Sequence, residues 1–438
     1  MLTFLKKLWN KKRKNGYYFI HIPKTAGTSF INLLDGCVNE AEIFPVQLWH
    51  QVNSEIIRKK KKFRLLRGHF GGGSYQLLCD NNPHRLTILR HPQSLSVSTY
   101  HFIKREKNTA VHDLVTNKNL TLKEFLEEPL TALKVNNRMV RHLSFDLQED
   151  PEAQELFLSA QSINVVKKWI KSPKKINSKQ RYERAINALN ACSWFGIQEN
   201  FDQSMQLFSY TFNRPPFGKS PYLNAHKPNQ KIDKYCQDLI LKQNEYDMQL
   251  YQYATNLFQQ RHQEMCHKLQ QKFMYQELSL DEMIDKNYQQ SHTENLKSDH
   301  DYHFGMELLG SGWHRRELTL PENTFFRWTN NRKAFIDFWV TPNNYTLEIR
   351  VINAVTEKHL NALELHINDK PVPYTYDTNN GVVRIIQAEI SHTIIKNNLI
   401  RIEFNQPETL KHQDEFDSDD TRYLGIAVNW IKIQKCQK

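Results

Sequence analysis

Residues Tyr17 to Phe30 read YYFIHIPKTAGTSF. The apolar start of this stretch predicts a β-strand, and the glycine and hydroxyl residues after the lysine predict the beginning of a helix. Backbone N–H groups in the first turn of a helix have no intrahelical partner, and the helix dipole favours an anion beside them. Lys24 adds a full positive charge at this turn. The stretch therefore predicts a site for a phosphate or a sulfate ester.

The order of residues in the turn separates it from the common nucleotide-binding loop. A Walker A loop reads G-x-x-x-x-G-K-[ST], whereas Lys24 precedes Gly27 in this chain. We therefore expect a P-loop-like strand, turn and helix that lacks the Walker A arrangement.

Short apolar runs alternate with segments of helical periodicity as far as about residue 275. The expected strands are Tyr17–Ile22, Phe63–Arg67, Leu86–Leu89 and Trp194–Ile197. The expected helices are Thr28–Leu34, Ser94–Lys104, Leu122–Glu128, Ala153–Leu158, Arg181–Ala191 and Asp238–His267. This alternation is typical of βαβ units. It predicts an α/β domain over residues 17–275, in which helices flank a parallel sheet.

The pattern changes after a polar stretch at residues 276–301, which we interpret as a linker that is helical in part. Beyond it, runs rich in β-branched and aromatic residues are separated by turns that contain Asn, Asp and Gly. These runs are Phe325–Thr329, Ala334–Val340, Tyr345–Val355, Ala362–Ile367, Val372–Tyr376, Val382–Ile390, Leu399–Phe404 and Tyr423–Ile433. They predict a separate all-β antiparallel sandwich domain over residues 302–438.

Four tryptophans bear on the role of the predicted sandwich: Trp313, Trp328, Trp339 and Trp430. If they were exposed, they would favour a carbohydrate-binding module. The last three lie within strand patterns, which favours core packing for most of them. Glycan binding is therefore one hypothesis for this domain, and a scaffold or oligomerisation role is the other.

The 438 residues include 59 Lys and Arg against 47 Asp and Glu, a net charge of +12. Residues 1–70 hold 14 Lys or Arg against 4 Asp or Glu, so ten of the twelve excess charges fall there. The basic segment 1–16 and the run Arg58–Lys62 are typical of solvated surface. They would alternatively steer an anionic ligand to the turn, or bind nucleic acid or anionic lipid. No RNA-binding aromatic motif or zinc finger accompanies them, so we expect no nucleic-acid partner.

The six cysteines are scattered without a C-x-x-C pair, which indicates neither a zinc site nor a disulfide framework. No apolar run approaches the roughly 20 residues that span a bilayer. The apolar segment near the N-terminus is too short for a secretory signal. We therefore predict a cytoplasmic protein that has neither a metal nor a transmembrane segment.

A second group of informative residues lies at 87–104, TILRHPQSLSVSTYHFIK. Ligands of open α/β sheets bind beyond the carboxyl ends of the strands, so Arg90 is expected near Lys24. An NTPase would need a carboxylate at such a strand end to hold Mg²⁺, whereas arginine binds phosphate without a metal. The alternative is a surface salt bridge from Arg90, with Ser94 as a helix cap.

Together, HIPKTAGTSF and LRHPQSLSVSTYHF resemble the 5′-phosphosulfate loop and the 3′-phosphate site of sulfotransferases that use 3′-phosphoadenosine 5′-phosphosulfate (PAPS). The resemblance is closest to the branch that includes heparan sulfate 2-O-sulfotransferases and related carbohydrate sulfotransferases. Further pieces follow in the order of that branch: RGHF at 67–70, NRMVRHL at 137–143, FGIQENF at 195–201, Asn224 in LNAHKP, and YDMQLY at 246–251. The resemblance covers about residues 17–258.

The resemblance implies transfer of a sulfuryl group from PAPS to a hydroxyl of a carbohydrate, without a metal and with 3′-phosphoadenosine 5′-phosphate (PAP) as product. Lys24 would contact the bridging oxygen of the donor. The 5′-phosphosulfate would lie against the turn formed by Lys24, Thr25, Ala26, Gly27, Thr28 and Ser29.

The 3′-phosphate would lie against Arg90 and Ser98. Two neighbours depart from the family pattern. His91 stands where the family often has an acidic residue or asparagine, and Leu95 where it often has a second arginine.

Our choice for the base that takes the acceptor proton is His69. It follows the strand Phe63–Arg67, and Gly71-Gly72-Gly73 beyond it would leave room for a substrate. A histidine titrates near neutral pH, as a general base should. The rivals are His101, Glu106 and His21, the last of which is expected to point into the fold. A buried histidine bonded to backbone is the alternative for His69.

Four further residues have two interpretations each. Arg138 and Arg141, three apart on one predicted helix, would orient an anionic acceptor or form an ordinary surface pair. Tyr100 and Trp49 would stack on adenine or sugar, or pack in the core.

Two other functions stay open: a P-loop kinase or NTPase, and a non-catalytic protein that binds anionic glycans. The sequence leaves the acceptor, the sulfated position and the oligomeric state undefined.

Overall fold

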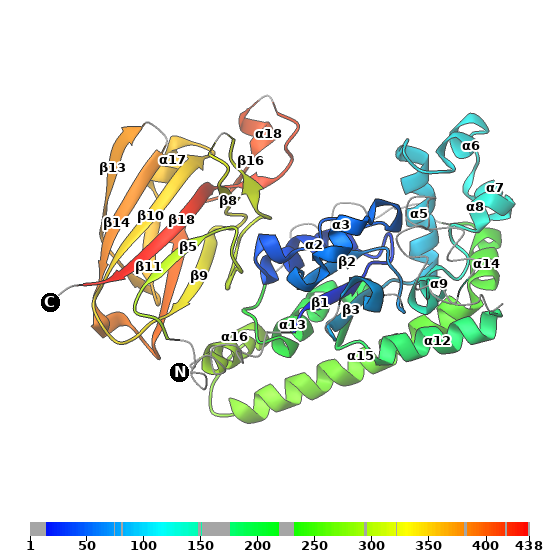
Figure 1. Cartoon of the computed structure of the whole chain (residues 1–438), viewed down its shortest axis with the longest axis horizontal. Coiled ribbons are helices and arrows are strands. Elements are labelled where there is room, and N and C mark those ends of the chain that lie inside the picture. The colour runs from blue at the N-terminus through cyan, green and yellow to red at the C-terminus, as the bar shows by residue number, and fades with distance from the viewer. Residues whose placement is uncertain are drawn as a thin grey trace. The chain divides into compact units, whose positions relative to one another are not determined.

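The computed structural model describes residues 15–73, 75–79, 82–147, 150, 176–218, 232–292, 296–320, 322–380, 383–416 and 418–436 (Figure 1). Three predictions lie outside these residues: the basic segment as far as residue 14, the helix Ala153–Leu158, and Asn224. The chain forms two compact units. Unit 1 comprises Met1–Thr28, Glu42–Ser204 and Asn224–Arg261, and unit 2 comprises Ser29–Ala41, Met205–Leu223 and His262–Lys438.

Three helices contribute residues to both units: α2 (Gly27–Leu34), α13 (Phe201–Thr211) and α15 (Glu245–Lys272). The borders predicted at residues 16, 275 and 301 follow shifts in composition, which mark a change of structural class along the chain. As domain borders they stay predictions.

Unit 1 is built on a four-stranded parallel sheet with the strand order β2-β1-β3-β4 (Figure 1). The strands are β1 (Tyr17–Ile20), β2 (Leu65–Gly68), β3 (His84–Leu89) and β4 (Trp194–Ile197). Every residue of β1 and β4 is buried, as expected of parallel strands that are covered on both faces. The predicted parallel sheet with helices is confirmed, and the narrower P-loop-like class stays a prediction.

The other α-helices within the described residues of unit 1 are mostly short. They are α3 (Ser54–Arg58), α4 (Tyr75–Leu78), α5 (Pro92–Arg105), α6 (His112–Asn117), α7 (Leu122–Glu127), α8 (Pro129–Ala132), α9 (Arg138–Ser144), α12 (Ser178–Asn190) and α14 (Lys234–Gln243). Helix α5 begins with Pro92, at a position where the missing N–H costs nothing.

The single helix predicted over Asp238–His267 is wrong, because α14 and α15 are interrupted at Asn244. The side chain of Asn244 accepts a hydrogen bond from the backbone N–H of Asn137 at 2.9 Å and donates one to the carbonyl of Ile240 at 2.9 Å. An asparagine that bonds locally and to another segment competes with the helical ladder. The sequence pattern gave no sign of this distant partner.

Unit 2 contains the predicted antiparallel sandwich (Figure 1). One sheet has the order β13-β14-β10-β18-β8-β7, with β5 paired to β18, and the other has the order β12-β11-β15-β9-β6. The strands of the first sheet are β5 (His300–His303), β7 (Glu317–Leu318), β8 (Phe325–Trp328), β10 (Tyr345–Ala354), β13 (Tyr374–Asn380), β14 (Val383–Ile390) and β18 (Ile426–Lys435). Those of the second are β6 (Gly310–Ser311), β9 (Lys333–Trp339), β11 (Glu364–Ile367), β12 (Lys370–Pro371) and β15 (Leu399–Asn405).

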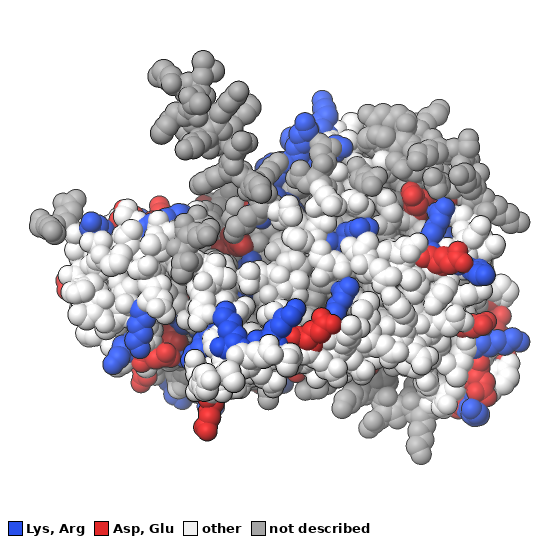
Figure 2. All heavy atoms as spheres, turned by 90° about the horizontal axis from the view of Figure 1, so that it is seen from below, with Lys and Arg blue, Asp and Glu red and all other residues white. Residues whose placement is uncertain are grey.

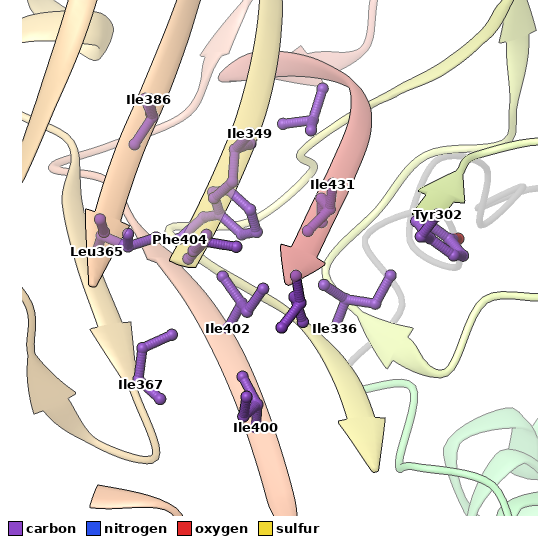
Figure 3. Close-up of a cluster of buried hydrophobic side chains, with 14 of the residues drawn as sticks. Tyr302, Ile336, Ile349, Leu365, Ile367, Ile386, Ile400, Ile402, Phe404 and Ile431 are labelled. Carbon is purple, nitrogen blue, oxygen red and sulfur yellow. The ribbon is translucent and has the colours of Figure 1, made fainter. Parts of the chain in front are cut away.

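Side chains from both sheets meet in the core of the sandwich (Figure 3). Ile349 and Ile431 of one sheet and Ile402 of the other are fully or almost fully buried. The core therefore follows from the two-residue periodicity of strands such as β10, whose alternate residues are buried.

Three of the four tryptophans lie in the interior, as predicted for most of them. Trp313, Trp328 and Trp339 are 5–7% exposed. Trp430 is only half-buried and alternates along β18 with the buried Ile431, so it lies on the outer face of its sheet. Trp430 is the exception to the core interpretation.

The predicted linker contains a well-formed helix, α16 (Leu280–Ser291). Ser279 caps its N-terminus in a capping box with Glu282, which satisfies the first backbone N–H groups of the helix. Met283, Ile284 and Tyr288 are buried. The stretch is polar in composition, yet part of it is packed structure.

Unit 2 also contains smaller elements, among them α17 (Glu357–Asn361), β16 (Leu410–Lys411), α18 (His412–Glu415) and β17 (Tyr423–Leu424). Within the described ranges, every helix is too short or too polar to span a lipid bilayer. On the face drawn in Figure 2, Lys and Arg side chains are interspersed with Asp and Glu side chains. Charges of one sign do not cover this face.

Candidate functional site

The turn between β1 and α2 contains two residues with positive φ. Lys24 has a φ of 70° and Ala26 a φ of 66°, whereas Thr25 between them is not in the left-handed region. Such alternation turns successive backbone N–H groups toward one side and forms a concave site for an anion. The buried Thr25 hydroxyl donates to the carbonyl of Ile22 at 2.9 Å, which fixes the turn from within.

Gly27 begins α2, and His21 explains why a glycine stands there. A Cβ at Gly27 would lie 2.1 Å from both Cδ2 and Nε2 of His21. Any larger residue would therefore push the start of α2 away from the end of β1. Thr28 is exposed and Ser29 is half-buried in the same first turn.

Arg90 lies directly after β3, which pairs in parallel with β1, and it reaches the turn. Its Nη1 donates to the carbonyl of Lys24 at 2.9 Å. The predicted proximity of Arg90 and Lys24 is thus present in the structure. The Nε of Arg90 is buried and has no hydrogen-bond partner among the residues that the structure describes.

Glu199 supports the residue after Arg90 from the end of β4. It accepts hydrogen bonds from the backbone N–H of His91 and from the hydroxyl of Tyr251, both at 2.9 Å. The rings of His91 and Tyr251 also meet edge to face. Glu199 belongs to the FGIQENF segment and Tyr251 to the YDMQLY segment. The sequence alone gave neither residue a role, and these contacts show a structural one.

Lys24 is surrounded by other cations. Burial lowers its pKa, and the charges of Arg105, Arg90 and Arg138 lower it further, while Glu106 acts in the opposite direction. Its ammonium group lies 4.2 Å from the centre of the Phe102 ring. A positive potential of this kind favours an anionic ligand.

Ser98 lies on α5 and is half-buried. Within the described residues it makes no hydrogen bond, so its hydroxyl is available. No contact joins it to Arg90, and its predicted role at a 3′-phosphate stays a prediction.

The tautomer of His69 follows from its hydrogen bond. Its Nδ1 lies 2.7 Å from the carbonyl oxygen of His21, and a carbonyl only accepts, so Nδ1 carries the proton. Nε2 then has a free lone pair, and the described residues offer it no hydrogen bond. Burial lowers the pKa of His69 to about 4, an effect that the bond to His21 partly opposes. The bond to backbone is the alternative that the sequence left open for His69, and a pKa of about 4 differs from the expected titration near neutral pH. The role of His69 as the base stays a prediction.

Three histidines form a cluster around this residue. The ring of His69 stacks on that of His21 with centroids 4.5 Å apart, and the ring of His142 meets it edge on at 6.4 Å. Burial holds the pKa of both His21 and His142 well below the usual range. The prediction that His21 points into the fold agrees with its 8% exposure. The cluster is therefore neutral at physiological pH.

Arg138 and Arg141 are placed differently on α9. Arg138 donates to the Thr99 hydroxyl at 2.9 Å, and burial lowers its pKa to about 9. Arg141 donates to the carbonyl of Leu133. Neither contact tests the predicted role in orienting an acceptor.

A buried carboxylate from α15 caps the beginning of α9. Asp247 accepts hydrogen bonds from the backbone N–H groups of Met139 at 2.9 Å and Val140 at 2.8 Å. It is fully buried, and burial raises its pKa to about 6. This cap fixes the helix that bears Arg138 and His142. The sequence drew attention to the YDMQLY motif, which contains Asp247. It did not reveal that this aspartate binds the beginning of α9.

The glycines after His69 allow a close approach of the chain, and the prediction that they leave room for a substrate stays a prediction. A Cβ at Gly71 would lie 2.1 Å from the Phe145 ring, and one at Gly72 would lie 1.9 Å from the carbonyl oxygen of Leu143. The glycines allow the chain around α9 to approach closely.

Trp49 and Tyr100 belong to the core, so stacking on adenine or sugar is not their role. Trp49 is 1% exposed and donates from Nε1 to the carbonyl of Phe70 at 3.1 Å. Tyr100 is 7% exposed and donates to the carbonyl of Leu120 at 2.9 Å.

The two other rivals for the base lie on and just after α5. His101 is half-buried, and burial lowers its pKa. Glu106 forms an ion pair with Arg105 at 3.2 Å. Among the described contacts, neither side chain is bonded to a backbone carbonyl in the way that fixes the tautomer of His69.

A cavity of about 290 Å³ also lies in unit 1, lined by residues that include Gly72, Arg85, Leu143 and Asn187. Lys24, His69 and Arg90 do not line it. The cavity is therefore separate from the turn that bears Lys24.

No family model matches the chain. It is similar to heparan-sulfate 6-O-sulfotransferase 2 of Homo sapiens, with 30% identity over 208 residues, 43% of this chain and 31% of that protein. The Gallus gallus protein of the same name matches with 31% identity over 151 residues, 34% of this chain and 33% of that protein. Heparan-sulfate 6-O-sulfotransferase 1 of Cricetulus griseus matches with 30% identity over 146 residues, 33% of this chain and 32% of that protein.

This similarity supports a sulfotransferase relationship. The chain spans only about a third of the length of these curated relatives. They are named 6-O-sulfotransferases, so the narrower likeness to the 2-O branch stays a prediction. Among solved structures, the C-terminal CBM6 of LamC, a laminarinase from Zobellia galactanivorans, matches with 12% identity and a TM-score of 0.20, over 31% of this chain and 99% of that chain.

Proposed function

We propose that this chain is a sulfotransferase that moves a sulfuryl group from PAPS to a hydroxyl of a carbohydrate acceptor. The observation that carries the proposal is the hydrogen bond from Arg90 to the carbonyl of Lys24, which unites two anion-binding groups at one edge of the sheet. The similarity to heparan-sulfate sulfotransferases supports the same reading.

Three features of the described residues fit such a donor. The turn at Lys24 and Ala26 has the alternating backbone of an anion site. The buried Nε of Arg90 lacks a partner that a phosphate oxygen would supply. Lys24 lies among cations that an anionic ligand would compensate. Lys24 would contact the bridging oxygen, and the turn from Thr25 to Ser29 would hold the 5′-phosphosulfate.

The chemistry needs a base and a group that stabilises charge on the leaving phosphate. PAPS supplies the sulfuryl group, whose bond to the phosphate oxygen breaks as a bond to the acceptor oxygen forms. His69 takes the acceptor proton on Nε2 and passes from neutral to charged. Lys24 stabilises the negative charge that grows on the leaving oxygen. The negative charge of the bound donor raises the pKa of His69, which makes it a stronger base in the complex.

Two residues of α9 would orient the acceptor. Arg138 and Arg141 carry the positive charge that an anionic glycan needs, and Arg138 lies close enough to affect the pKa of both His69 and Lys24. The acceptor is therefore proposed to carry carboxylate or sulfate groups beside the reacting hydroxyl.

Calorimetry with PAP and with ATP separates the possible classes of enzyme. We expect PAP to bind without Mg²⁺ and more tightly than ATP, because Arg90 and Ser98 favour a 3′-phosphate. Tight ATP binding that depends on Mg²⁺, followed by hydrolysis, would favour a kinase or NTPase. Transfer of labelled sulfate from PAPS to heparan-type acceptors would exclude a non-catalytic glycan-binding protein.

We also propose that the sandwich binds glycan, on the basis of Trp430. The cross-strand register places Trp430 beside Arg350 of β10 and His303 of β5, and Lys432 lies with its ammonium group 4.8 Å from the Trp430 ring. An aromatic face beside hydrogen-bonding side chains suits a sugar ring. Trp430→Ala should weaken retention on immobilised heparan sulfate, whereas Gln434→Ala on the same strand should not. Equal retention of both variants would refute this role.

A further inference from the structure

The helix that begins at the donor turn is completed inside unit 2. Helix α2 runs on directly into a 3₁₀ turn, η1 (Asp35–Cys37), and the residues from Ser29 to Ala41 belong to unit 2. Phe30 and Leu34 are fully buried, and the Phe30 ring meets that of Phe208 edge on at 5.3 Å. The orientation of this helix is therefore set by contacts within unit 2.

Backbone carbonyls at the end of this helical run receive their hydrogen bonds from the loops of the sandwich. The guanidinium of Arg316 donates to the carbonyls of Asp35 and Val38, the latter at 2.9 Å. The backbone N–H of Leu308 donates to the carbonyl of Gly36 at 2.8 Å. The last carbonyls of a helix have no intrahelical partner, so these groups act as its C-terminal cap.

Arg316 is well placed to hold that end of the helix rigidly. It is 8% exposed, and a third bond, to the carbonyl of Gly305 at 2.8 Å, fixes its guanidinium to the sandwich. Its positive charge lies at the carbonyl end of the helix, where the dipole favours a cation. The N–H end of the same helix is the proposed donor site.

We propose that Arg316 is a positioning residue for the donor site. By capping η1 from the sandwich, it holds α2 so that the N–H groups of Gly27 and Thr28 face the donor phosphosulfate. The identity of the ligand rests on the proposed function, whereas the cap itself does not. On this proposal, the sandwich contributes to donor binding through Arg316.

The test compares two buried arginines of unit 2. Arg316→Gln removes the cap. Arg401→Gln is the matched control, because Arg401 binds Asp285 and Asp337 and has no hydrogen bond to residues 29–41. Hydrogen exchange of the backbone amides at 27–34 is measured in both variants, with α5 as the internal reference. The dissociation constant for PAP is measured by calorimetry, well below the melting temperature of each variant.

We expect Arg316→Gln to accelerate exchange at 27–34 and to raise the PAP dissociation constant about three- to tenfold, the size of a lost interaction at a helix end. In assays of transfer, the KM for PAPS should rise more than kcat falls. Arg401→Gln should lower the melting temperature without either change. If Arg316→Gln fails to fold, Arg316→Lys keeps the charge but reaches fewer carbonyls, and a smaller change in the same direction is expected.

Unchanged exchange and unchanged PAP affinity in the folded Arg316 variants would overturn the proposal and leave Arg316 a residue of the sandwich alone. If the wild-type chain does not bind PAP, the proposed function fails. The exchange at 27–34 still decides whether Arg316 positions the helix.

Discussion

Buried cations occur in two regions with opposite surroundings. In unit 2, Arg401 donates to both oxygens of Asp285 and of Asp337 at 2.6–2.8 Å, so its charge is compensated by protein. In unit 1, Arg90 donates to the carbonyl of Lys24, which is a neutral group.

Three cations around the turn of unit 1 differ from others in that unit, such as Arg181, which pairs with Asp150. Within the described residues, no ion pair or hydrogen bond joins Lys24, Arg90 or Arg138 to a carboxylate. Charge that is removed from water without compensation costs free energy. The contrast leads us to expect that Arg401 stabilises the fold, whereas Lys24, Arg90 and Arg138 are available to an anionic ligand.

The largest expected effect concerns His69, the proposed base. His69→Ala should lower the rate of transfer by about 10²–10⁴-fold and leave PAP affinity unchanged, because the variant loses only the proton acceptor. Single-turnover assays with labelled PAPS measure the rate, and His50→Asn, at an exposed histidine of unit 1, serves as the control. Wild-type turnover in His69→Ala would mean that another group takes the proton.

The compensated arginine should behave in the opposite way. Asp337→Asn is expected to lower the free energy of unfolding by about 3–5 kcal/mol, because it removes one partner of a buried pair. PAP affinity should not change. Chemical denaturation and calorimetry measure the two quantities, and a loss of PAP binding in the folded variant would break the comparison.

Lys24→Ala should lower kcat by about 10²–10³-fold, the usual effect of removing one group that stabilises a developing negative charge. Its melting temperature should not fall, since Lys24 has no carboxylate partner to leave uncompensated. Lys61→Ala, in the exposed run after α3, is the matched control. A clear loss of stability in Lys24→Ala would show that this cation is structural.

The histidine cluster predicts a loss of stability in acid. Burial lowers the pKa of His69 from 6.5 to about 4, so the unfolded chain binds more protons below pH 6.5. The free energy of unfolding should therefore be unaffected by this group above pH 6.5 and should decrease as the pH falls toward 4. Asp247, whose pKa burial raises to about 6, acts in the opposite direction. Thermal melts of wild type and His69→Ala isolate the histidine, and equal slopes would contradict the prediction.

The smallest expected effect is stabilisation by a simple anion. Sulfate at millimolar concentration should raise the melting temperature of the wild-type chain by a few degrees, as expected for a ligand that binds only the folded state. It should have less effect on Lys24→Ala. Chloride at equal ionic strength is the control, and equal shifts in both proteins would argue against an anion site at the turn.

The sheet and the turn could be predicted because they are marked by apolar runs and turn residues that lie next to one another in the sequence. The strand Trp194–Ile197 has the predicted bounds, and the apolar run before Pro23 locates β1. The rule that strand ends carry ligands placed Arg90 near Lys24, and the hydrogen bond between them agrees.

The rest depends on partners that are distant in sequence. Asp247 caps a helix whose first residues lie more than 100 positions earlier, and no local pattern reveals such a pair. The glycines after His69 show the same limit. The sequence suggested that they leave room for a substrate, and only the fold shows that Phe145 and Leu143 approach them closely.

The bond from Arg316 to the carbonyl of Asp35 spans 281 residues and therefore has a consequence for biosynthesis. A ribosome adds about 5–20 residues per second, so Arg316 is made roughly 15–60 seconds after the helix that it caps. During that interval, Phe30 and Leu34 lack the unit that buries them. The nascent chain thus exposes apolar surface along α2 until unit 2 has been translated, and chaperones are expected to bind it there.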